Sequence, residues 1–102
     1  MKPFAEICHQ LSAGEFEFSR HAFKRVVERN ISNDEITQLS EKAELIENYP
    51  EDKFSPSCLI LGFTHKNRLL HIQVSFADTP LIRIITLYEP DPKEWIEFRK
   101  RR

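Results

Sequence analysis

Glycine, cysteine and long apolar runs are scarce in this sequence, and each scarcity excludes a kind of protein. With only 2 glycines in 102 residues, the chain has no glycine-rich loop that could cradle phosphate groups. Its 2 cysteines, Cys8 and Cys58, lie far apart with no second pair beside them, which argues against a zinc ribbon or a disulfide framework. We expect both to be buried thiols.

The chain also lacks the marks of a membrane or secreted protein. No apolar run approaches the roughly 18 residues of a membrane span, and charged side chains interrupt Met1–Leu11, where a signal peptide would lie. We therefore expect a cytoplasmic protein that makes no contact with a membrane. The length of 102 residues and the hydrophobic content of 40% predict a single folded domain over residues 1–102.

The net charge of -1 conceals an uneven distribution of charge. Residues 19–29 and the tail 99–102 are basic, whereas residues 34–52 carry many acids against Lys42 alone. A surface divided in this way could meet a phosphate backbone with its basic side, although segregated charge is also common on solvated faces.

The first part of the sequence predicts three helices and one short strand. Apolar residues recur at three- and four-residue spacing in a segment that Pro3 opens and Gly14 closes. Ser19 is a natural N-cap for a second helix, and Ser32 forms a capping box with Glu35 at the start of a third. The expected helices cover residues 3–13, 19–30 and 32–43, with a brief strand over 16–18.

From Leu45 onward the pattern changes to β-strands separated by turn residues. The breaks at 66–67 and 78–80 are short enough to join antiparallel neighbours, which predicts a meander with strands near 45–50 and over 58–63, 69–77 and 81–88. Asp91–Pro92 is expected to start a short C-terminal helix with Trp95 and Phe98, releasing the basic tail. The fold class is therefore α+β, with N-terminal helices packed on an antiparallel sheet.

An alignment of Phe76 with Ile82 sets the expected register of the last two strands. It assigns Leu70, Ile72, Val74, Ile84, Thr86 and Tyr88 to the core face with that pair, and His71, Gln73, Ser75, Arg83, Ile85 and Leu87 to the other face.

The second helix carries the first candidate site. His21, Arg25 and Arg29 are spaced by four residues, so they form a stripe on one side of the helix. A histidine can move a proton near neutral pH, and an arginine can hold a phosphate and neutralise charge that develops on it. The alternative is a solvated basic helix face.

The second candidate is His71, which interrupts an apolar strand. If the helix packed across its face, His21 and His71 could meet around one phosphate and act as an acid–base pair for transesterification. The alternative is a half-exposed strand histidine. Thr86 and Tyr88 could touch substrate at the end of the last strand, although such residues are also what a strand prefers.

Metal chemistry has little support in the sequence. The carboxylates of residues 34–52 lack the paired spacing of a two-metal nuclease or a glycosidase. Histidines and cysteines show no short ligand spacing either. We expect neither a metal nor another cofactor.

Several segments together are similar to one family. They are Phe18-Ser19-Arg20-His21-Ala22 with Arg25, Glu28-Arg29 and Ile31-Ser32; Ile46-Glu47; Tyr49-Pro50-Glu51-Asp52-Lys53; Pro56-Ser57 with residues 59–62; Leu70-His71; and residues 84–90 with Asp91-Pro92 and Trp95. In order and spacing these segments resemble the small prokaryotic domains catalogued as domain of unknown function 4258, over about residues 16–95.

The resemblance implies a toxin. Members of this family look like RelE-type and related small ribonuclease toxins with helices on an antiparallel sheet, an architecture also described as barnase-like. They are often paired with a zinc-finger antitoxin that resembles the MqsA type. The family motif points to the following site residues: His21, Arg25, Arg29, His71, Thr86 and Tyr88.

The expected reaction is metal-independent cleavage of RNA, in which a ribose 2'-hydroxyl attacks the adjacent phosphate and leaves a 2',3'-cyclic end. His21 or His71 would be the base and the other the acid, while Arg25, with Arg29 or Arg83, would stabilise the phosphorane. Basic tail residues, Arg99 and Arg101 among them, would bind the RNA backbone or be covered by the antitoxin.

Two rival functions do not involve catalysis. The chain could be a binding module that inhibits a protein target, as ParE-like relatives of the same fold group inhibit gyrase. It could also be a partner domain whose basic helix docks on an acidic protein.

Overall fold

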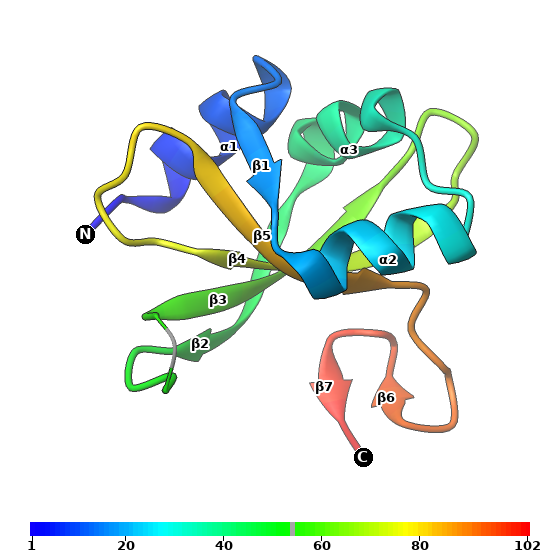
Figure 1. Ribbon diagram of the computed structural model, residues 1–102. Coiled ribbons are helices and arrows are strands. Elements are labelled where there is room, and N and C mark those ends of the chain that lie inside the picture. Colours follow the sequence, from blue (N-terminus) through cyan, green and yellow to red (C-terminus); the bar gives the residue numbers. More distant parts are fainter. Residues whose placement is uncertain (54) are drawn as a thin grey trace.

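Helices lead the chain, and a β-sheet fills most of its second half (Figure 1). The computed structural model describes residues 1–53 and 55–102. In these residues the elements are α1 (Phe4–Ser12), β1 (Phe16–Phe18), α2 (Arg20–Glu28), α3 (Asn33–Leu39), the 3-10 helix η1 (Ser40–Lys42), β2 (Glu44–Tyr49), β3 (Ser57–Phe63), β4 (Leu69–Ser75), β5 (Ile82–Tyr88), β6 (Trp95–Ile96) and β7 (Lys100–Arg101). The predicted α+β class is confirmed.

Helices α2 and α3 begin where the sequence predicts them, because local side chains satisfy backbone N–H groups in their first turns. Ser19 Oγ accepts a hydrogen bond from the Ala22 N–H (3.0 Å) at the start of α2. Ser32 and Glu35 form the predicted capping box at the start of α3. The chain leaves α1 through Gly14, whose φ of 75° lies in the left-handed region that glycine adopts without strain.

Five strands form the main sheet in the order β1-β5-β4-β3-β2. Strands β2 to β5 are the predicted antiparallel meander. The short strand β1 lies beyond β5 and runs parallel to it, with Phe16 opposite Ile82 and Phe18 opposite Ile84. Because β1 stops there, no strand in the described part of the chain covers that edge of β5 beyond Ile84.

The predicted register holds only at the start of β5. Val74 pairs with Ile84, as the alignment of Phe76 with Ile82 requires. A bulge follows this pair and shifts the alignment by one residue for the rest of the two strands.

The bulge corrects the faces predicted for the second half of β5. Ile72 pairs with Leu87, so Leu87 and not Thr86 or Tyr88 joins the core face. His71 pairs with Tyr88 on the other face. The physical reason is that the extra residue lets the apolar side chains of both halves of β5 face the helices, which strict alternation forbids.

The core fills the space between one face of the sheet and the helices, with α1 and α3 above the sheet and α2 across β5 (Figure 1). Its buried residues include Ile7, Leu11, Ala22, Ile36 and Leu39 from the helices and Ile60, Leu70, Ile72, Val74, Ile82, Ile84 and Leu87 from the sheet. Gly62 lets β3 approach α3 closely, because a Cβ there would lie 2.8 Å from the Leu39 carbonyl oxygen.

The predicted C-terminal helix is wrong, since residues 95–101 form the β6–β7 hairpin. Glu97 and Phe98 have φ angles of 51° and 62°, and the Arg99 N–H donates to the Ile96 carbonyl (3.0 Å) to close a tight turn. The turn allows Trp95 to pack edge-on against His71, with 4.5 Å between ring centroids. The hairpin thus covers the sheet face opposite to the helices (Figure 1).

The basic tail is not released as predicted. Arg99 Nη2 pairs with Glu44 Oε2 at 2.7 Å, and Arg101 Nε pairs with Glu47 Oε2 at 3.2 Å. The Arg101 guanidinium also lies over the Trp95 ring, 4.6 Å from its centroid. These acids of β2 face the hairpin, so they hold two tail cations against the sheet.

Candidate functional site

The two candidate histidines lie on opposite sides of the sheet. His71 is fully buried and faces the hairpin, whereas Ile72 beside it points into the core that Ala22 of α2 shares. His21 is exposed on α2 and makes no hydrogen bond or ion pair with any residue that the structure describes. The expectation that His21 and His71 meet around one phosphate is therefore wrong.

His71 instead forms a hydrogen-bonded pair with Tyr88. His71 Nε2 lies 2.7 Å from the Phe98 carbonyl oxygen, and Nδ1 lies 3.2 Å from the Tyr88 hydroxyl. A carbonyl can only accept, so Nε2 carries the proton of the neutral imidazole. Nδ1 is then an acceptor, and the Tyr88 hydroxyl donates to it.

Burial fixes the protonation states of this pair. It lowers the pKa of His71, because an imidazolium is poorly solvated under Trp95, so the neutral ring predominates at pH 7. It also raises the pKa of the Tyr88 phenol, which keeps its proton. The pair is therefore a neutral phenol that donates to a neutral, unprotonated imidazole nitrogen.

Tyr88 lines a surface pocket of about 530 Å³ at the end of β5. Arg29, Glu89, Asp91 and Glu94 line the pocket with it. The structure thus brings Arg29 and Tyr88, two of the predicted site residues, into one cavity, and it places His71 directly behind Tyr88.

Arg29 reaches this pocket because α2 runs along the open edge of β5. At the start of the helix, the Ser19 hydroxyl donates to the Ile85 carbonyl (2.9 Å). At its end, Arg29 Nη1 donates to the Leu87 carbonyl (3.4 Å). The stripe that begins with His21 therefore follows the strand edge to the pocket.

Arg25 lies in the middle of that stripe but is engaged elsewhere. Its Nη1 pairs with Glu28 Oε2 at 2.6 Å on the helix surface. A ligand would have to compete with this carboxylate, so Arg25 is less available to a phosphate than Arg29.

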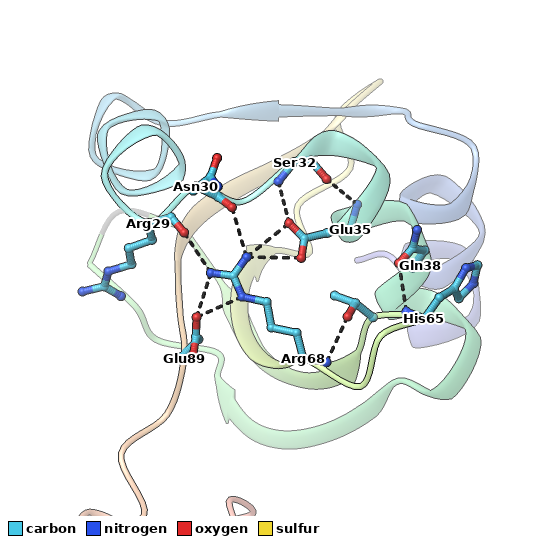
Figure 2. A network of polar contacts seen from close by, with 9 residues as sticks. Arg29, Asn30, Ser32, Glu35, Gln38, His65, Arg68 and Glu89 are labelled. Atoms are coloured by element: carbon cyan, nitrogen blue, oxygen red, sulfur yellow. Dashed lines mark hydrogen bonds and ion pairs between the residues drawn. The ribbon is translucent and has the colours of Figure 1, made fainter.

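Arg68 is the centre of a polar network that includes the pocket residues Arg29 and Glu89 (Figure 2). Its guanidinium donates to the carbonyls of Arg29 (2.8 Å) and Asn30 (3.1 Å) and to the carboxylates of Glu35 and Glu89. Figure 2 shows the Arg29 side chain pointing away from this network while its carbonyl takes part in it. Arg68 therefore joins the end of α2, the start of α3 and the end of β5.

The charges of this network support one another. Burial by itself would raise the pKa of Glu35, but hydrogen bonds from Ser32 and Arg68 outweigh it and hold that pKa below its usual range. The ion pair with Arg68 also compensates the charge of Glu89, with 2.7 Å between Nη2 and Oε1. Sequence reasoning missed Arg68, because a lone arginine in a turn has no spacing signal.

The remaining predicted residues lie away from the pocket. Arg83 pairs with Glu17 (3.3 Å) at the other end of β5. Thr86 is half-buried opposite Gln73. Arg99 and Arg101 are held at β2 by the ion pairs described above. The structure therefore assembles Arg29, Tyr88 and His71 out of the nine predicted site residues.

The part of the chain that the structure describes contains neither a metal-binding cluster nor a membrane-spanning helix. The structure describes no group of three or more histidine, cysteine or acidic residues arranged to hold a metal ion among residues 1–53 and 55–102. None of the helices in the same residues is long and apolar enough to cross a membrane.

Comparison with known proteins places this site within one family. A family model described as "Domain of unknown function (DUF4258)" matches residues 18–89, which is more than half of the chain. The chain belongs to the DUF4258 family. The segment that matches DUF4258 contains Arg29, Arg68, His71 and Tyr88 and ends before the hairpin. No curated protein and no solved structure matches this DUF4258 chain significantly.

Proposed function

We propose that this DUF4258 domain is the toxin of a toxin–antitoxin pair and that it cleaves RNA without a metal ion. The observation that carries the proposal is the hydrogen bond between the buried His71 and Tyr88, a tyrosine that lines the same pocket as Arg29. A proton acceptor behind a hydroxyl and a guanidinium beside it are the groups that transesterification of a phosphodiester needs.

In the proposed reaction the proton passes through two groups. The ribose 2'-hydroxyl gives its proton to the Tyr88 oxygen as Tyr88 gives its own proton to His71 Nδ1. The 2'-oxygen then bonds to phosphorus, the bond from phosphorus to the 5'-oxygen breaks, and water protonates that oxygen. The products are a 2',3'-cyclic phosphate end and a 5'-hydroxyl end, and His71 later returns its proton through Tyr88 to solvent.

Each protein group has a distinct task in this scheme. Tyr88 touches the substrate and relays the proton, whereas His71 acts behind it and is held by the Phe98 carbonyl. Arg29 stabilises the charge that develops on the non-bridging phosphate oxygens. His21 and Arg25 are assigned to the RNA backbone along α2, and not to proton transfer.

The partners and compartment follow from the same proposal. The substrate is single-stranded RNA, whose backbone can follow the basic stripe of α2 into the pocket. As a toxin that acts on cellular RNA, the protein is assigned to the cytoplasm, and a cognate antitoxin of the zinc-finger type is assigned to its control.

The test is growth after induced expression, with total RNA sampled early and its new ends analysed. We expect growth arrest with 2',3'-cyclic ends for the native chain. Tyr88→Phe and Arg29→Ala should each lower cleavage about 100-fold or more. The matched controls are Tyr49→Phe, which removes another half-buried phenol hydroxyl, and Arg83→Ala, which removes an arginine outside the pocket.

Binding without catalysis is the second candidate, because three of the five residues that line the pocket are carboxylates and disfavour a phosphate. Such an inhibitor of a protein target would arrest growth without new RNA ends, and Tyr88→Phe would leave the arrest unchanged. That outcome would replace the nuclease proposal with the binding module.

A further inference from the structure

The side of α2 that faces away from the Arg29 stripe is apolar and exposed. The side chains of Phe23 and Val27 are 59% and 65% exposed and are neighbours on one face, whereas single exposed apolar residues are common on folded domains. They lie one turn apart on the helix. At about 100° per residue, their side of the helix is opposite to that of Arg25 and Arg29.

The apolar area continues from the helix onto β1. The ring of Phe18 lies 6.5 Å from that of Phe23, and Phe16 lies 5.7 Å from Phe18. Phe16 and Phe18 are half-buried against the core, and β1 is the last strand of the sheet on this side. We call the four residues Phe16, Phe18, Phe23 and Val27 the Phe23 surface.

Two cations border the Phe23 surface and lack acidic partners. Arg20 and Lys24 are exposed and make no hydrogen bond or ion pair with the residues that the structure describes. By contrast, Arg25 on the next turn is paired with Glu28. An occupant of this surface would therefore gain from apolar side chains in its centre and from acids at its edge.

We propose that the Phe23 surface binds an acidic amphipathic helix of a partner protein. Phe23 and Val27 have the one-turn spacing with which one helix presents side chains to another. The acids of the bound helix would pair with Arg20 and Lys24. RNA fits less well, because the aliphatic Val27 offers no ring on which a base can stack. This interaction does not depend on the cleavage reaction proposed above.

The test uses a defined probe and the purified full-length protein. The probe is a fluorescent synthetic peptide of about 18 residues, with leucine at alternating third and fourth positions and glutamate on both flanks. We expect saturable binding by fluorescence anisotropy, with a Kd that Phe23→Asp raises about tenfold or more and Lys24→Glu raises about threefold. Leu81→Asp, at an apolar residue that is 39% exposed in a loop, is the matched control and should not change the Kd.

Three outcomes would overturn the proposal. The first is absence of peptide binding, and the second is binding that Phe23→Asp leaves unchanged. The third is preferential binding of a single-stranded RNA oligonucleotide that Phe23→Asp abolishes, which would make this surface a base-stacking site. Circular dichroism checks that each variant is folded, and Val27→Asp replaces Phe23→Asp if the latter is not. No RNA cleavage is measured, so the result is independent of the proposed nuclease.

Discussion

On one face of the sheet the helices bury aliphatic side chains such as Leu11, Ile36 and Ile72, whereas on the other face the hairpin covers His71 with Trp95 and with ion pairs to β2. The helix side is held by apolar burial, which has no preferred direction. The hairpin side depends on individual hydrogen bonds and ion pairs, which need defined distances and angles. The comparison teaches that apolar burial and directional polar contacts are divided between the two faces of one sheet, and that the proposed proton-transfer residue His71 lies on the polar one.

The largest expected effect is on the helix side. Leu39→Ala removes a fully buried side chain that packs where α3 meets β3, so we expect it to lower the free energy of unfolding by about 3 kcal/mol. Urea denaturation measures the loss. Leu81→Ala, at a partly exposed loop residue, should change the same quantity by less than about 0.5 kcal/mol. Equal losses for the two variants would contradict the division of roles.

A smaller loss is expected at the Arg68 network, which joins the end of α2 and the start of α3 to the end of β5. Arg68→Ala removes the donor to the Arg29 and Asn30 carbonyls and one of the donors to the Glu35 carboxylate, and we expect it to destabilise the fold by about 1–2 kcal/mol. It should also weaken cleavage by displacing Arg29, which the RNA assay above measures. Arg68→Lys should rescue only part of either effect, because an ammonium cannot reproduce the planar array of donors. Full rescue would show that only the charge matters.

The pH dependence of stability should report on His71 at the hairpin side. Its folded-state pKa is lowered mainly by burial, so the neutral form stabilises the fold, and this contribution is fully present above the unfolded pKa of about 6.5. It is lost progressively as the pH falls below that value. Denaturant midpoints between about pH 7.5 and 5 should therefore decrease for the native chain and less for His71→Gln. An identical slope for both would mean that His71 does not titrate as described.

The smallest effect is expected for a single ion pair of the hairpin. Arg101 is 61% exposed, so its pairing with Glu47 should contribute only about 0.5 kcal/mol and should weaken in salt. A double-mutant cycle with Arg101→Ala and Glu47→Ala measures the coupling directly. A coupling above about 2 kcal/mol would show that the hairpin side relies on this pair more than its exposure implies.

The same division explains what could be predicted from the sequence. The caps at Ser19 and Ser32 are local signals, and the alternation in β4 identifies the core face, so the helices and the meander could be predicted. The hairpin could not be predicted, because Glu97 and Phe98 adopt positive φ angles without glycine or asparagine to indicate a turn.

The candidate site depends on features that have no sequence pattern. A one-residue bulge places Tyr88 opposite His71, and without it Tyr88 would face the core. Arg29 was identified from its spacing, but the pocket around it is made by the chain after β5, whose path depends on the hairpin. Residue types could therefore be predicted, and their assembly could not.

Arg99 and Arg101 are paired with acids of β2, so these two cations contribute little to the attraction of a polyanion. These two tail cations are compensated internally, whereas Arg20, Lys24 and Arg29, on α2 and at its end, form no ion pair with the residues that the structure describes. A contact confined to one short helix displaces about two or three condensed counterions, which predicts a shallow dependence of RNA affinity on salt concentration. The binding footprint on RNA would accordingly be a few nucleotides, and recognition of longer targets would have to come from a second molecule.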